Sequence, residues 1–360
     1  MRSIFLVIFI VSIVFSFGCS DPQLGPGRVS GVKVDTASGM VSHLHGQHLP
    51  ALEGVEVWDN FYGPGVKLLT KHYEIYTTWL DPLVLRQVPY FLESAYRGYN
   101  DQLAHPIESR VRFSVYLFGE RKEWEDFTTF FAGPYAPMYH KIQAGAYYLN
   151  GSCVAFNIGR ERTFRAIGHE GWHQFNSRHF SFRLPSWLDE GIAMLFERAR
   201  YEDVKFSFEP GLNIERLAEL KKTMSDGKMI PLLELTALNP GELLATGSGL
   251  ARVSTEEEQT QSLRAFYSQC YALVRFLRED GYGKRLGSYH RLLFDGLNGK
   301  WPLSERQKTV AADRNVALTV AWNREVGPKL LKNYFGDDVE RIEQEYQMFC
   351  GKIVYRVRLK

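Results

Sequence analysis

In the middle of this 360-residue chain, the sequence reads Ile167-Gly168-His169-Glu170-Gly171-Trp172-His173-Gln174-Phe175. Two histidines four positions apart lie on one face of a helix, about 6 Å apart along its axis, so both imidazoles can reach one metal ion. This spacing suits zinc, and Glu170 can take a proton from a metal-bound water. The pattern therefore predicts a helix that carries two zinc ligands, His169 and His173, and a general base.

A second helical segment follows at 184–197, with Pro185 and Ser186 at its start. Catalytic zinc takes three protein ligands and a water, and Glu190 is the expected third ligand. The step from 173 to 190 is 17 positions, so sixteen residues intervene, enough for one helix to end near 176–179 and a second to return. The alternative is a pair of packed amphipathic helices with an accidental histidine pair and no metal.

HExxH followed by W-x-x-E-G-x-A at Trp187–Ala193 resembles the gluzincin metallopeptidases. More narrowly, it resembles the bacterial peptidase MA-like group of exported proteins and lipoproteins, which are largely of unknown function. The resemblance covers roughly residues 71–349 and implies a zincin-like fold of the α+β class. It also implies one zinc ion (Zn2+) per chain, bound by His169, His173 and Glu190, with Glu170 as general base in the hydrolysis of a peptide or protein substrate.

Two further features gain a role from family resemblance. Tyr267-Ser268-Gln269-Cys270 resembles the Tyr-x-Lys-Gly segment of aminopeptidases of the leukotriene hydrolase type, whose tyrosine donates to the oxyanion, although a core tyrosine is the alternative. In gluzincins, a strand just before the HExxH helix lies along the cleft and pairs with extended substrate. This implies that the backbone near Gly145 and Ala146 holds a peptide, although a plain structural hairpin is equally compatible with the pattern.

Two departures from the family pattern bear on function. Met194 stands where thermolysin-like gluzincins have the aspartate that orients a zinc-bound histidine, which leaves Asp189 and Glu197 as candidates for that role. Residues 145–152 lack the glutamate with which aminopeptidases capture an amino terminus, so an endopeptidase is expected. Two other functions remain open. The first is a zinc-stabilised envelope protein that binds a partner without hydrolysing it, although the intact Glu170 argues against this function. The second is a zinc hydrolase that acts on a non-peptide amide.

The pattern of apolar residues predicts strands and helices first, then helices alone. Strands are expected at 72–78 and 111–118, and Asp81-Pro82 begins a helix that runs to about Asn100. Asn150-Gly151 predicts the turn of a hairpin over 145–157 that leads directly into the HExxH helix. Further helices are expected at 120–131, 213–222, 255–277 and over most of the chain after 304. This order is typical of an α+β fold.

Composition restricts the class of protein. With 45% hydrophobic and 14% aromatic residues, the chain can form one large or two medium domains with real cores. Basic and acidic residues number 43 and 41 and are interspersed, so no strong field favours nucleic acid as a partner. There is no CxxC pair, which argues against a thiolate zinc site.

The first 19 residues resemble an export signal. Met1-Arg2 precedes an apolar run at 4–17, whose fourteen residues fall short of the roughly 20 that span a membrane. The segment Ser16-Phe17-Gly18-Cys19 resembles a bacterial lipoprotein cleavage site. The alternatives are ordinary signal cleavage and an uncleaved anchor. A protein lipid-anchored through Cys19 at the membrane surface of the bacterial cell envelope is therefore expected. Cys153, Cys270 and Cys350 then allow at most one internal disulfide.

These observations predict four parts of the chain. They are a signal peptide at 1–19, a tether with an irregular or β-rich lead-in at 20–70, a catalytic domain at 71–300, and a helical segment at 301–360 that packs on the catalytic domain.

Overall fold

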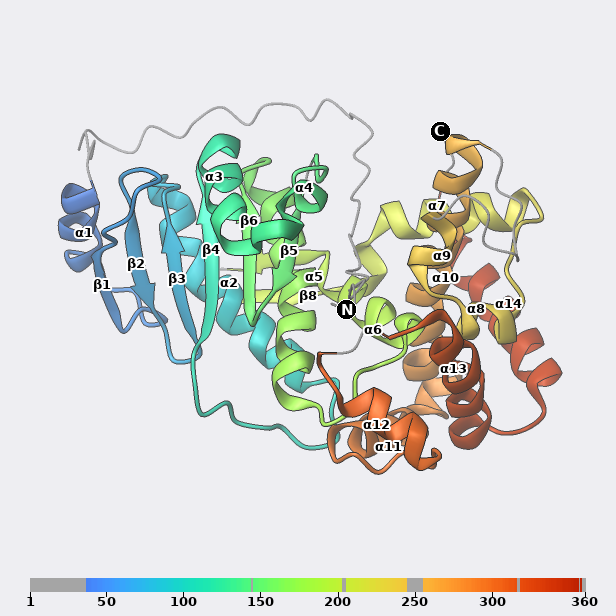
Figure 1. Cartoon of the computed structure of the whole chain (residues 1–360). Coiled ribbons are helices and arrows are strands. Elements are labelled where there is room, and N and C mark those ends of the chain that lie inside the picture. Colours follow the sequence, from blue (N-terminus) through green and yellow to red (C-terminus); the bar gives the residue numbers. More distant parts are fainter. Residues whose placement is uncertain are drawn as a thin grey trace.

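The computed structural model describes residues 37–143, 145–202, 205–244, 255–315, 318–355 and 357. The fold is of the α+β class, with a mixed six-stranded sheet in the amino-terminal half and mostly helices after it (Figure 1). Cys19, the expected lipidation site, lies outside the described residues. Within those residues, no helix is long and apolar enough to cross a membrane.

The sheet has the strand order β1-β2-β3-β4-β6-β5. Its strands are β1 (Gly54–Val57), β2 (Val66–Leu69), β3 (Tyr73–Thr77), β4 (Phe113–Phe118), β5 (Ala146–Leu149) and β6 (Ser152–Phe156). Strands β3, β4 and β6 are parallel to one another, β1 and β2 form antiparallel pairs on one side of them, and β5 runs antiparallel to β6 on the other. β5 is therefore an antiparallel strand at the edge of the sheet.

Helices cover both faces of the sheet. Helices α2 (Pro82–Asn100) and α5 (Arg160–His179) pack on one face, and α3 (Arg121–Ala132) packs on the other, followed by η1 (Gly133–Tyr135) and α4 (Ala136–Tyr139). The alternation of side chains along β6 divides the core accordingly. Cys153 and Ala155 belong to the large cluster with α2 and α5, whereas Val154 and Phe156 belong to the smaller cluster under α3.

The carboxyl-terminal half is helical apart from one small hairpin. In chain order it contains α6 (Ser186–Ala193), η2 (Met194–Phe196), β7 (Ala199–Glu202), β8 (Lys205–Phe208), η3 (Pro210–Leu212), α7 (Ile214–Ser225), α8 (Leu232–Ala237), α9 (Pro240–Leu244), α10 (Glu256–Gly283), α11 (Leu286–Leu297), α12 (Glu305–Ala312), α13 (Val320–Phe335) and α14 (Val339–Val354). Helix α10 packs against α6, α7, α11 and α14. One hydrophobic cluster includes side chains from Met40 to Val354, so both halves share a core.

Most of the expected elements are confirmed. Asp81 accepts hydrogen bonds from the N–H groups of Leu83 and Val84 at the start of α2. Asn150 and Gly151, with φ of 49° and 83°, form the turn between β5 and β6. The lead-in contains β1 and β2, in agreement with the expected β-rich structure, but residues 37–45 form helix α1 (Ala37–His45), which was not expected. Its serines, glycine and histidines obscure the helical spacing of its few buried apolar residues.

Candidate metal centre

Helices α5 and α6 bring the three expected ligands together between the sheet and the helical half (Figure 1). Nε2 of His169 lies 3.3 Å from Oε2 of Glu190, and Nε2 of His173 lies 3.7 Å from Oε1 of the same carboxylate. One ligand atom from each residue lies within 4.8 Å of the others. All three residues are buried, and within the described chain no hydrogen-bond partner is found for His173 Nε2 or either Glu190 oxygen. Two imidazoles and a carboxylate that converge in this way can hold a metal ion.

A carboxylate holds the other ring nitrogen of each histidine. Oε1 of Glu197 lies 3.2 Å from Nδ1 of His169, and Oδ1 of Asp189 lies 3.0 Å from Nδ1 of His173. When Nδ1–H donates to a carboxylate, Nε2 keeps its lone pair for a metal and the ring is fixed in orientation. Asp189 and Glu197 were the two candidates for this role from the sequence. In the structure, Asp189 contacts His173 and Glu197 contacts His169.

Asp189 is itself held by the face of α5. Its Oδ1 accepts hydrogen bonds from Trp172 Nε1 at 3.0 Å and from Asn176 Nδ2 at 2.6 Å. Together with His173, these residues lie along α5 at positions 172, 173 and 176, so one turn of helix places three partners around one carboxylate oxygen. The side chain that orients His173 therefore has little freedom to move.

Glu197 is an ionised carboxylate in the protein interior. Arg216 of α7 donates to it through Nη2 at 2.8 Å and Nε at 3.0 Å, and Asn213 Nδ2 donates at 2.8 Å. Burial alone raises the pKa of Glu197, but the guanidinium groups of Arg216 and Arg165 outweigh burial and hold that pKa well below its usual range. No spacing in the sequence pointed to Arg216 or Asn213, because both come from a separate helix.

Two glycines of the sequence motifs allow the helices to approach closely. A Cβ atom at Gly191 would lie 2.6 Å from the carbonyl oxygen of Cys270 on α10, and a Cβ atom at Gly168 would lie 2.6 Å from the carbonyl oxygen of Phe196. A side chain at either position would push its neighbour away. The glycine after Glu190 therefore has a structural reason, since it lets α6 lie directly against α10.

Glu170 is buried next to the ligands but is not one of them. Burial raises the pKa of Glu170 to about 7, although the nearby His173 and His169 act in the opposite direction. The backbone N–H of Tyr148 on β5 donates toward this carboxylate. Glu170 thus lies between the metal ligands and the edge of the sheet.

The open edge of β5 faces this carboxylate. The two-residue turn closes on the Leu149–Ser152 pair, so the backbone N–H and C=O groups of Ala146 and Tyr148 point away from β6. No strand in the described part of the chain pairs with that edge. Gly145, with φ of 143°, comes directly before the strand. The backbone near Gly145 and Ala146 therefore lies on the same open edge as the Tyr148 N–H that faces Glu170.

Tyr267 lies on α10, beside the same group. Its ring is buried, and the guanidinium of Arg216 lies over it, 5.6 Å from the ring centroid. Burial, followed by the charge of Glu190, raises the pKa of Tyr267 well above its usual range. A phenol that stays protonated near Glu190 and Glu170 is available as a hydrogen-bond donor.

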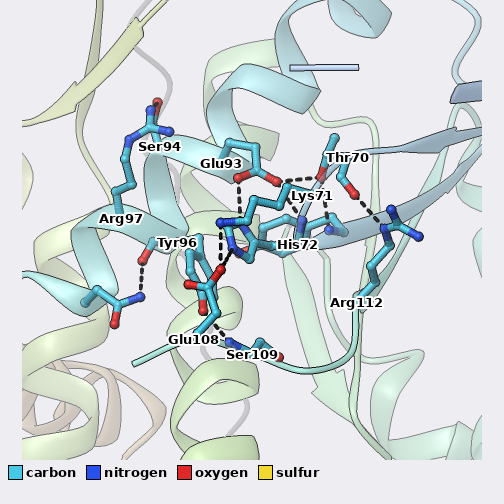
Figure 2. A network of polar contacts seen from close by, with 12 residues as sticks. Thr70, Lys71, His72, Glu93, Ser94, Tyr96, Arg97, Glu108, Ser109 and Arg112 are labelled. Atoms are coloured by element: carbon cyan, nitrogen blue, oxygen red, sulfur yellow. Dashed lines mark hydrogen bonds and ion pairs between the residues drawn. The ribbon is translucent and has the colours of Figure 1, made fainter. Parts of the chain in front are cut away.

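Among the described residues, neither the three cysteines nor His72 belongs to a further group of metal-ligating side chains. Cys153, Cys270 and Cys350 are free and buried, so none of them forms a disulfide with another. Figure 2 shows His72, whose Nδ1 lies 2.7 Å from Oε2 of Glu93 and whose ring stacks on a tyrosine. Glu93 also accepts from the N–H of His72, which ties the start of β3 to α2. Only His169, His173 and Glu190 bring three possible ligands together in the described ranges.

The metal-free protein should lose stability as pH rises from 7 to 9.5. Burial lowers the pKa of His169 and of His173, but their carboxylate partners outweigh it and raise these values to about 9 and about 10. A raised histidine pKa stabilises the fold fully below about 6.5, the unfolded value, and this stabilisation is lost as pH rises through the folded value. Calorimetry of chelator-treated protein measures the melting temperature. Zinc-loaded protein, with neutral imidazoles, should lack this fall, and a rise in the metal-free melting temperature over this range would contradict the assigned contacts.

A scan against models of known protein families finds no match to this chain, and a search of curated proteins finds no similar one.

Proposed function

We propose that the protein is a zinc-dependent endopeptidase of zincin-like fold that uses Glu170 as general base. The observation that carries the proposal is the buried carboxylate of Glu170. It is not one of the three candidate ligands, His169, His173 and Glu190, yet it lies beside them and faces the open edge of β5. Two histidines and a glutamate are a donor set typical of catalytic zinc, which leaves one position open for water. A purely structural zinc site has no use for a base in this place.

The roles of the residues follow from their positions. His169, His173 and Glu190 would hold the zinc ion, which would supply a Lewis acid for a water and for the substrate carbonyl. Glu170 accepts the proton of the attacking water and passes it to the leaving amine. Tyr267 donates a hydrogen bond to the carbonyl oxygen as negative charge develops there. Asp189 and Glu197 keep the imidazoles oriented throughout.

The open edge of β5 supports a peptide as the substrate. An extended chain can pair with the backbone N–H and C=O of Ala146 and with the C=O of Tyr148, and so lie across the metal group, with Gly145 at the entrance. Residues 145–152 contain no acidic side chain to hold an amino terminus, which favours cleavage within a chain. We place this activity in the bacterial cell envelope, with the protein anchored through a lipid on Cys19, as the amino-terminal sequence predicts.

A peptide panel read by mass spectrometry tests the function. The zinc-loaded protein should cleave internal peptide bonds, a chelator should stop the cleavage, and added zinc should restore it. If the protein binds zinc but cleaves no peptide, a zinc-stabilised envelope protein that only binds its partner becomes the better description. If it cleaves only small non-peptide amides, the substrate class is wrong and the metal assignment stands.

The Tyr267→Phe variant tests the oxyanion role. The change removes one hydroxyl and should lower kcat by roughly 10²-fold, with a smaller effect on KM, because the hydrogen bond strengthens in the transition state. Steady-state kinetics on one cleaved peptide provides both values. Tyr271→Phe serves as the matched control. It also removes a hydroxyl from α10, but this hydroxyl donates to the carbonyl of Pro210. Full activity of Tyr267→Phe, with a lower melting temperature, would assign Tyr267 to the core.

A further inference from the structure

Two arginines lie together near the metal centre without forming an ion pair in the described chain. Arg183 lies between α5 and α6, and Arg314 follows α12. Burial and the charge of Arg314 lower the pKa of Arg183 to about 10, against the opposing charge of Asp313. Two guanidinium groups that repel one another in this way are stabilised when an anion binds between them.

Hydrogen bonds to backbone hold both side chains in place. Nη2 of Arg183 donates to the carbonyl of Val310 at 2.7 Å, and Nη2 of Arg314 donates to the carbonyl of Phe180 at 2.6 Å. Nε of Arg183 is buried and has no acceptor among the described residues. Arg314 is exposed, and its other N–H groups make no further hydrogen bond within the described chain. The pair therefore keeps donors available in a fixed position.

The pair lies near the residues at the end of β5. Arg314 interacts electrostatically with Tyr148, the β5 residue whose N–H faces Glu170, and with Asp189, which holds His173. Gln174 Nε2 donates to the carbonyl of Gly151 at 2.7 Å, which places the second half of α5 beside the turn that ends β5. Figure 1 shows α12 near the lower end of α5, in agreement with the hydrogen bond from Arg314 to Phe180.

We propose that Arg183 and Arg314 form a subsite for a carboxylate of the bound peptide. The planar fork of N–H groups on each guanidinium matches the two oxygens of a carboxylate. That carboxylate belongs to an aspartate or glutamate side chain, or to the carboxyl terminus of the peptide. This inference rests on the proposed peptidase function and adds a substrate preference to it. The protein prefers acidic peptides although its overall charge is nearly balanced.

Matched peptides test the preference. Three peptides share one cleaved sequence: one has glutamate at a single position, the second has glutamine there, and the third has glutamate and an amidated carboxyl terminus. The set is repeated with the variable residue moved to each position of the sequence in turn. At one of these positions, the kcat/KM of the parent protein should be roughly 10-fold to 100-fold higher for the glutamate peptide than for the glutamine peptide. Loss of the preference on amidation alone assigns the subsite to the terminus.

Arg314→Gln should abolish this preference, so that kcat/KM for the glutamate peptide falls to about the value for the glutamine peptide. Arg314→Lys keeps the charge but not the fork, and should retain only part of the preference. Arg178→Gln makes the same change at an exposed arginine in the last turn of α5 and is the matched control. Equal cleavage of all the peptides by the parent would overturn the subsite and leave the peptidase function intact.

A binding experiment tests the subsite even if no peptide is cleaved. Calorimetry with N-acetylglutamate amide should detect binding to the parent and at least 10-fold weaker binding to Arg314→Gln. N-acetylglutamine amide should bind to neither protein. Failure of the parent to bind the glutamate derivative more tightly than the glutamine derivative would refute the carboxylate subsite, whatever the protein hydrolyses.

Discussion

The Glu170→Gln variant should bind zinc as the parent does, yet hydrolyse peptides about 10²-fold to 10⁴-fold more slowly. The amide keeps the size of the side chain but cannot take a proton from water. Its effect on stability has a definite sign in the metal-free protein. Burial raises the pKa of Glu170 to about 7, so the parent loses stability as pH rises from about 4.5 through 7, and the neutral glutamine does not. The metal-free variant should therefore melt at about the same temperature as the parent at pH 4 and at a higher one at pH 8.

Zinc analysis, kinetics and calorimetry at the two pH values check this prediction. Glu161→Gln is the matched control, because Glu161 lies in the first turn of the same helix and its side chain is 74% exposed. That variant should keep full activity. If Glu170→Gln hydrolyses peptides as fast as the parent, the general-base mechanism is wrong. If it loses its zinc, Glu170 is a ligand and the assignment of Glu190 needs revision.

Glu197→Gln should cost about 3–5 kcal/mol of the free energy of unfolding at neutral pH and weaken zinc binding about 10-fold to 100-fold. Removing this negative charge leaves Arg216 buried without its main partner, and it loosens the ring of His169. The pKa of Glu197 is held well below its usual range once the arginines outweigh burial. Its stabilisation is therefore present above the unfolded pKa of about 4.3 and is lost only as pH falls through the lower folded value.

Urea unfolding at pH 7 and zinc titration measure both effects. Glu219→Gln removes the other carboxylate bound to Arg216, at 3.1 Å and in a more exposed position, and should cost at most about 1 kcal/mol. Comparing the two variants separates the loss of a buried partner from a general loss of charge around Arg216. Equal and small effects would mean that water or another group satisfies Arg216 in the absence of Glu197.

The two candidate metal ligands on α5 were predictable because the relation between His169 and His173 is local. Four positions along a helix are one turn, whatever the rest of the chain does. The prediction of Glu190 required an additional expectation, that a second helix returns to the first. Pro185 and the apolar pattern supported this expectation. The structure confirms that these three residues meet, whereas zinc and catalysis remain predictions.

The surroundings of the ligands were less accessible to sequence reasoning. Whether Asp189 or Glu197 orients a histidine depends on how α6 and η2 rotate against α5, and no local pattern determines that rotation. Arg216 reaches Glu197 from α7, so only the packing of separate elements reveals the pair. The hairpin over 145–157 was predictable from Asn150-Gly151, but its place at the edge of the sheet depends on the strand order.

The open edge of β5 limits the proposed enzyme to certain states of its targets. A strand edge pairs only with a chain that is already extended, so a helix or tight turn has to unwind before it lies across the metal group. For a folded target, the cleavage rate should then follow the free energy of local opening of the segment, when opening and closing are fast compared with cleavage. Frayed termini and long loops should be cut quickly and the interiors of stable domains hardly at all, so susceptibility would report the folding state of a target as much as its sequence.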